Sequence, residues 1–214
     1  MENYLYTLKK SGVSSHMVIG QLLSRHKPHV ILDVGCGPGF LAKTLTYKPN
    51  TLIGLDKINF KRLESYKKVH QIHLDRDAWP KALKNNSFEA IILADILEHL
   101  ENPPKTLNQI KKLLKNDGFI LVSVPNAGFW LMRLATLFGI SPKMDKGIFD
   151  KTHIHNYKKA DMYTMLKEAD FTVEKVMFTQ VPLRIFFLSN LFFRVFPNLF
   201  SYQIIVKASK GAVL

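Results

Sequence analysis

A glycine-rich loop between an apolar strand and the start of a helix constrains this 214-residue chain more than any other feature. The strand signal is Val30–Val34, which runs directly into Gly35-Cys36-Gly37-Pro38-Gly39, and Phe40–Leu45 can begin a helix. Glycines let a backbone approach a ligand and adopt positive φ, and a helix N-terminus offers free N–H groups. This order of elements predicts a nucleotide cradle. A plain connection between strand and helix is the alternative.

An acid follows the loop where a nucleotide site needs one. Asp56 comes directly after the next strand signal, Thr51–Leu55, and a carboxylate there can accept both ribose hydroxyls. Dinucleotide-binding proteins place their third glycine three positions after the second. Here position 40 is Phe and the third glycine is Gly39, so the spacing disfavours NAD or FAD.

Strand and helix patterns alternate along the chain. Short β-rich runs lie at His29–Val34, Thr51–Leu55, Val69–His73, Phe88–Leu93, Phe119–Val124, Phe171–Phe178 and Tyr202–Val206, and helical patterns lie at Met17–Arg25, Pro104–Lys115 and Lys158–Ala169. Such alternation predicts an α/β fold of the Rossmann-like, doubly wound type, with ligands at the carboxyl ends of the strands. The last two strands lack a convincing crossover helix. We therefore expect a mostly parallel seven-stranded sheet whose last strand is antiparallel.

Composition limits the organisation and the cellular setting. The chain has the length of one domain and shows no repeat or linker, so we expect a single domain over residues 1–214 that begins with a helical segment, 1–27. The single cysteine, Cys36, indicates a reducing compartment, and neither a signal peptide nor a spanning segment is evident. We therefore expect a cytoplasmic protein. The net charge of +13 is compatible with binding to an anionic partner surface. The alternative is that the basic surface of the protein is only solvated.

Four motifs in order carry a family resemblance, which covers about Val30–Phe178. They are Leu32-Asp33-Val34-Gly35-Cys36-Gly37-Pro38-Gly39; Gly54-Leu55-Asp56; Ser87–Ile92 continuing to Asp95-Ile96-Leu97-Glu98-His99-Leu100; and Leu113–Gly118 leading to Val124-Pro125-Asn126. At these residues the chain resembles the class I S-adenosylmethionine-dependent methyltransferases. Within that class it is similar to the group that includes ubiquinone-biosynthesis and surface-polysaccharide methyltransferases. Glu89 departs from the family, which more often has Asp at this position.

The resemblance implies S-adenosylmethionine as cofactor and assigns residues to it. It implies that Gly35, Cys36 and Gly37 contact the methionine and ribose portions, Asp56 the ribose hydroxyls, Lys57 the side of the adenine, Asp75 the adenine amino group, and Leu93 and Ala94 the sulfonium and amino-acid tail. Asp77 is the alternative to Asp75.

Two histidine-containing segments hold the candidates for a catalytic base, Glu98-His99 and Asp150–Tyr157. We favour His153 as base or substrate contact, because imidazole accepts a proton near neutral pH, and we take His99 as a second candidate. Either residue can instead only shape its loop through hydrogen bonds. No ligand pattern such as His-Glu-x-x-His occurs, so we expect no metal site.

Two apolar insertions, 127–150 and 183–200, should emerge at the cofactor edge, which indicates an amphiphilic acceptor or peripheral attachment to the anionic inner membrane face. A packed lid or an oligomer interface is the alternative. We predict O-methylation of a small-molecule, lipid-linked or glycan acceptor. A nucleic-acid methyltransferase is disfavoured, because Leu93-Ala94-Asp95-Ile96 lacks the Asn/Asp-Pro-Pro-Tyr/Phe signature. A non-catalytic module that binds the cofactor is a further alternative.

Overall fold

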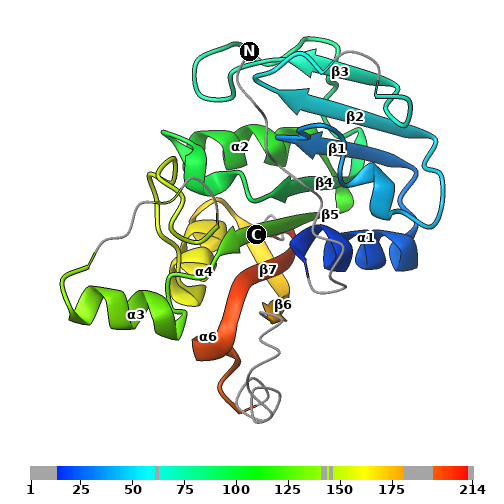
Figure 1. Ribbon diagram of the computed structural model, residues 1–214. Helices are drawn as coiled ribbons and strands as arrows, with labels where there is room; N and C mark the ends of the chain where they lie inside the picture. Colours follow the sequence, from blue (N-terminus) through cyan, green and yellow to red (C-terminus); the bar gives the residue numbers. More distant parts are fainter. Residues whose placement is uncertain (1–13, 61–62, 141–143, 145–146, 181–194, 212–214) are drawn as a thin grey trace.

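The structure, a computed structural model, describes residues 14–60, 63–140, 144, 147–180 and 195–211. It forms one seven-stranded sheet in the order β3-β2-β1-β4-β5-β7-β6 (Figure 1). The strands are β1 (Val30–Val34), β2 (Thr51–Asp56), β3 (Lys68–Gln71), β4 (Phe88–Ala94), β5 (Leu114–Pro125), β6 (Phe171–Gln180) and β7 (Ser201–Lys210). β7 pairs antiparallel with both β5 and β6, whereas the pairs among β1 to β5 are parallel. The predicted fold class is therefore confirmed.

Helices cover both faces of the sheet (Figure 1). They are α1 (Ser15–His26), α2 (Pro103–Leu113), α3 (Trp130–Leu137), α4 (Lys159–Glu168) and the short α6 (Pro197–Phe200). α2 and α4 bury residues such as Leu107 and Leu166 in one apolar cluster, and α1 buries Ile19 and Leu23 in the other. The central strands pack between these clusters, as their near-continuous apolar sequences require.

Local signals explain where the helices begin and end. The Ser14 side chain accepts from the N–H of Met17 at the start of α1, and Lys27 ends that helix in the left-handed conformation. Asn102 caps α2 in the same way through the N–H of Lys105, with prolines in the first turn.

Two expectations about helices need correction. Phe40–Leu45 does not begin an α-helix; only a 3-10 turn forms at Ala42–Thr44, where the Thr44 hydroxyl donates to the carbonyl of Leu41. Such local side-chain bonds compete with helix propagation. α2 ends at Leu113 rather than Lys115, because Leu114 already pairs with Phe88 in the sheet.

The first predicted insertion contains α3, which Figure 1 shows set apart from the sheet. Its residues Leu137 and Phe138 are 77% and 69% exposed. In the second insertion, residues 183–194 lie outside the described residues, and α6 occupies its end. Among the described residues, no helix combines the length and apolar character needed to cross a membrane.

Candidate functional site

The glycine loop and Asp56 form one hydrogen-bonded unit at the carboxyl ends of β1 and β2. The N–H groups of Gly35 and Cys36 both donate to the carbonyl of Leu55, at 2.8 and 3.0 Å. The N–H of Gly37 donates to Oδ2 of Asp56 at 2.8 Å, and the N–H of Ile58 donates to Oδ1 at 2.9 Å. A carboxylate offers about four lone-pair directions, so Asp56 keeps two for a pair of ligand hydroxyls.

The glycines of the loop are required by conformation and by close packing. Gly35 and Gly37 have φ of +75° and +50°, a region that favours glycine. A Cβ on Gly35 would lie 2.7 Å from Cδ1 of Ile96, whereas a Cβ on Gly37 would meet nothing within 4 Å. The loop therefore packs tightly against the end of β4 and leaves open space over Gly37. Open space next to a half-buried carboxylate is the arrangement that a ribose site needs.

The other predicted cofactor residues near this unit differ in how far their side chains are exposed. Cys36 is buried, and its thiol packs toward Gly54, so only its backbone faces the loop surface. Leu93 is also fully buried, with its side chain in the core, and Ala94 ends the same strand. Lys57 is exposed directly after Asp56.

Asp75 lies in the loop between β3 and β4, and its partners lie just before α2. Its two carboxylate oxygens accept from the N–H groups of Glu101 and Asn102, both at 3.0 Å. Asp77, the alternative, accepts from the N–H of His73. Each carboxylate oxygen keeps a further lone pair, so Asp75 or Asp77 can still accept a hydrogen bond from adenine. That contact remains a prediction.

Asp33 lies beneath the loop and was not predicted as part of the site. Its Oδ2 accepts from the Tyr66 hydroxyl at 2.5 Å, and its side chain is almost fully buried. Burial raises the pKa of Asp33 to about 7; the negative charge of Asp56 adds to the rise, and the Tyr66 hydrogen bond opposes it.

Asp95, at the end of β4, joins parts of the chain that are far apart in sequence. Its carboxylate accepts from Ser15 Oγ, Ser123 Oγ and Gln203 Nε2, at 2.8, 2.9 and 2.8 Å. These donors come from α1, β5 and β7. The sequence motif contains Asp95, but nothing in it identifies the three donors.

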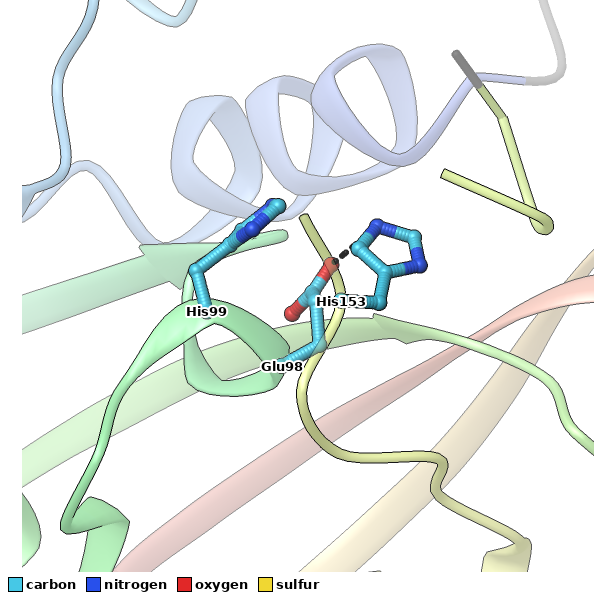
Figure 2. Close-up of side chains that lie close together, drawn as sticks. All are labelled: Glu98, His99 and His153. Atoms are coloured by element: carbon cyan, nitrogen blue, oxygen red, sulfur yellow. Dashed lines mark ion pairs between the residues drawn. The ribbon is translucent and has the colours of Figure 1, made fainter. Parts of the chain in front are cut away.

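Three side chains converge beyond Asp95, on the same edge. Glu98 and His99 belong to a 3-10 turn, Leu97–His99, and His153 comes from the segment before α4 (Figure 2). The His99 and His153 rings are 4.8 Å apart between centroids, and His153 Nε2 lies 4.0 Å from Glu98 Oε1. The structure thus brings together both predicted histidines. It adds Glu98, whose segment was a candidate but which was not singled out.

Burial sets the protonation of this group. Desolvation lowers the pKa of His99 and of His153, so both imidazoles are mainly neutral near pH 7. Desolvation also raises the pKa of Glu98 well above its ordinary value, and the negative charges of Asp95 and Asp150 add to that rise. Neutral imidazole nitrogens can accept a proton or bind a metal.

A cavity of about 420 Å³ adjoins His153. It lies between α3 and the segment 147–156, and its walls include Met132, Ala135, Thr136, Ile140, Ile148, Phe149, Asp150, His153 and Asn156. Apolar side chains from α3 and polar side chains from the facing segment both contribute to this wall. Polar groups set among apolar ones orient a ligand in small-molecule sites.

Comparison with known proteins agrees with this geometry. A family model described as a methyltransferase domain matches residues 17–176. The chain is 30% identical over 132 residues to the ubiquinone biosynthesis O-methyltransferase of Colwellia psychrerythraea, covering 59% of this chain and 53% of that protein. It is 24% identical over 154 residues to the same enzyme of Rickettsia canadensis, covering 68% and 64%. The chain thus spans less than two thirds of the length of these two relatives.

Solved structures share the fold. An S-adenosylmethionine-dependent methyltransferase from Archaeoglobus fulgidus aligns over 91% of this chain and 94% of its own, with a TM-score of 0.60 and 17% identity. A magnesium protoporphyrin IX methyltransferase from Synechocystis, solved with S-adenosylhomocysteine, aligns over 92% and 84%, with a TM-score of 0.60 and 16% identity. The chain therefore belongs to the class I S-adenosylmethionine-dependent methyltransferase family.

Proposed function

We propose that the protein transfers a methyl group from S-adenosylmethionine to a hydroxyl oxygen of a small-molecule acceptor. One observation carries the proposal: the glycine loop packs against the chain just after β4, and the turn that follows brings His99 next to His153, which lines the cavity. Gly35 of the cradle packs on Ile96, and the next turn carries Glu98 and His99. The Lys57 charge acts on His99, which is further evidence that the two halves adjoin.

In this proposal the chain holds the cofactor mainly through its backbone. The backbone of Gly35, Cys36 and Gly37 would contact the methionine and ribose portions, and Asp56 would accept the ribose hydroxyls. Lys57 and Asp75 would lie at the adenine, and Leu93 and Ala94 would line the sulfonium and amino-acid tail. Bound S-adenosylmethionine supplies an electrophilic methyl group on its sulfonium.

The acceptor would bind in the cavity beside His153. Methyl transfer is an in-line displacement, so holding the acceptor in line and excluding water would provide much of the catalysis. His153 would contact the acceptor hydroxyl or take its proton, with His99 as the second group. Apolar walls from α3 support a quinone-like or lipid-linked acceptor. A glycan is the alternative acceptor.

The test is methyl transfer by the full chain with labelled S-adenosylmethionine and a panel of phenols, catechols and sugars. We expect a labelled ether with a phenolic or catecholic acceptor, and we expect His153→Gln to turn over at least about 100-fold more slowly than the wild type. Binding of the cofactor should persist in that variant. Cofactor binding without turnover on any acceptor would favour a non-catalytic module. Turnover only on RNA or DNA would favour a nucleic-acid methyltransferase.

We further propose that the protein is cytoplasmic and that α3 attaches it to the anionic inner membrane face. Leu134, Leu137, Phe138 and Ile140 are all more than 40% exposed on or just after this helix. The chain carries a net charge of +13. Exposed apolar side chains on a basic protein are suited to an interface with anionic lipid.

Replacing Leu137 and Phe138 together by Ser should weaken co-sedimentation with phosphatidylglycerol vesicles by about tenfold or more. Each side chain contributes roughly 1.5–3 kcal/mol when it is fully buried. Tyr163→Ser is the control, because Tyr163 is 49% exposed on α4. Equal sedimentation of both variants and the wild type would rule out α3 as the contact.

A further inference from the structure

The Glu98 carboxylate is buried, and no other described residue donates a hydrogen bond to it. The residue is only 1% exposed. Burying an acceptor without a partner is costly, and natural proteins almost always satisfy such groups. An oxygen pair left in this state therefore points to a ligand or ion that completes it.

Two imidazoles face this carboxylate. One ligand atom each from Glu98, His99 and His153 can be chosen so that all lie within 4.8 Å of one another. Figure 2 shows the carboxylate between the two rings, with His153 reaching it from a separate segment. In a tetrahedral zinc site, two ligand atoms at about 2.0–2.1 Å from the ion lie about 3.4 Å apart. The 4.0 Å between Glu98 Oε1 and His153 Nε2 is longer by about half an ångström, so a small side-chain movement would close the site.

The remaining ring nitrogens are anchored as in known metal sites. His99 Nδ1 lies 3.1 Å from the carbonyl oxygen of Thr152, which can only accept, so Nδ1 carries the proton and Nε2 keeps its lone pair. His153 also makes a hydrogen bond to the backbone of Ile148. Metal-binding histidines almost always donate their other ring N–H to a carbonyl or carboxylate, which fixes the ring orientation.

The surrounding charge also favours a cation. Asp95 and Asp150 both act electrostatically on Glu98 and on both histidines. These two acids place negative charge beside the cluster, although the chain as a whole is basic. Two nitrogens and one carboxylate oxygen suit Zn²⁺ or Co²⁺, whereas Mg²⁺ and Ca²⁺ prefer oxygen ligands.

We propose that Glu98, His99 and His153 form a binding site for a divalent transition-metal cation of the Zn²⁺ type. Three protein ligands leave one coordination position open, as in catalytic zinc sites. His153 also lines the cavity, so that position is available to a ligand there. Only this last consequence, an acceptor oxygen on the ion, rests on the proposed function. The proposal departs from our expectation of no metal site, because the fold joins ligands that are distant in sequence.

The test uses the full chain, without an affinity tag and stripped of metal by a chelator. Titration with ZnCl₂ followed by calorimetry and elemental analysis should show about one bound ion per chain. Co²⁺ should give the absorption bands of a four- or five-coordinate site. Glu98→Gln and His153→Asn should each weaken Zn²⁺ binding at least tenfold, and His70→Ala, on the distant strand β3, should not. Circular dichroism verifies that each variant is folded.

The outcomes separate this site from the proposed function. Uptake of Zn²⁺ that is equal in the wild type and in both ligand variants would overturn the site, and so would substoichiometric uptake. Full methyl transfer by metal-free protein that takes up no Zn²⁺ would overturn the site and leave the function intact. Stoichiometric Zn²⁺ binding without methyl transfer to any acceptor would retain the site and overturn the function.

Discussion

Changing Asp56 to Ala should weaken binding of S-adenosylmethionine by about 10²-fold or more. Two hydrogen bonds from ribose hydroxyls to a charged acceptor contribute roughly 3–6 kcal/mol together, which corresponds to about 10²- to 10⁴-fold in affinity. The variant also releases the N–H of Gly37, which Asp56 holds at 2.8 Å. Calorimetric titration with S-adenosylmethionine and with S-adenosylhomocysteine measures the loss.

Two further variants identify the cause of that loss. Asp56→Asn can still accept from Gly37 but has no charge, so it should show an intermediate affinity. Asp117→Ala removes an exposed acid near the amino-terminal end of β5, at the opposite edge of the sheet, and should bind as tightly as the wild type. Unchanged affinity in Asp56→Ala would show that the ribose binds elsewhere, and the cradle would have to be reassigned.

The contribution of Asp33 to the stability of the protein should fall as the pH rises from about 4 to about 7. The folded state keeps a proton on this carboxyl up to a pKa of about 7, whereas the unfolded chain releases it near 3.8. Over that window the folded state binds more protons, so the free energy of unfolding decreases with pH, and it levels off above about 7. The full effect is on the order of 4 kcal/mol.

Urea unfolding of the wild type and of Asp33→Asn between pH 5 and 8 isolates this contribution. The asparagine keeps an acceptor for the Tyr66 hydroxyl but has no titratable group, so its stability should decrease less over the window. The difference between the two proteins should therefore grow with pH. Parallel curves would show that Asp33 does not titrate in this range. Tyr66→Phe removes the opposing hydrogen bond and should move the window to higher pH.

Short-range sequence signals predicted most of the fold. All seven predicted strands are present, because a short run of apolar or β-branched residues between turn residues is enough to indicate a strand. The two errors about helices have different causes, one tertiary and one local. Leu114 joins β5 instead of extending α2, because it pairs with Phe88. The Phe40–Leu45 segment shortens to a 3-10 turn, because the Thr44 hydroxyl bonds back to Leu41.

The candidate site likewise contains one contact that the sequence predicts and others that it does not. Asp56 meets the glycine loop because their strands, β1 and β2, are adjacent, and motif order alone predicts this. The meeting of Glu98 with His153 depends on the path of the segment before α4, where the N–H groups of Ile154 and His155 both donate to the carbonyl of Glu98. No local pattern encodes that contact. For the same reason, the donors to Asp95 could not be identified from the sequence.

The hydrogen bonds around Asp95 also constrain the order in which the chain can fold during synthesis. Ser15 and Gln203 are 188 positions apart in the sequence. The N–H of Ser15 donates to Oε1 of Gln203, and Nε2 of Gln203 donates both to Oγ of Ser15 and to the Asp95 carboxylate. During synthesis the ribosome must therefore have released β7 before the edge that carries Asp95 can close around it. Contacts this distant in sequence slow folding, since the loop-closure entropy is lost before they form. A nascent chain that has emerged only through β5 should lack the finished methyl-transfer centre, even though its glycine loop is already complete.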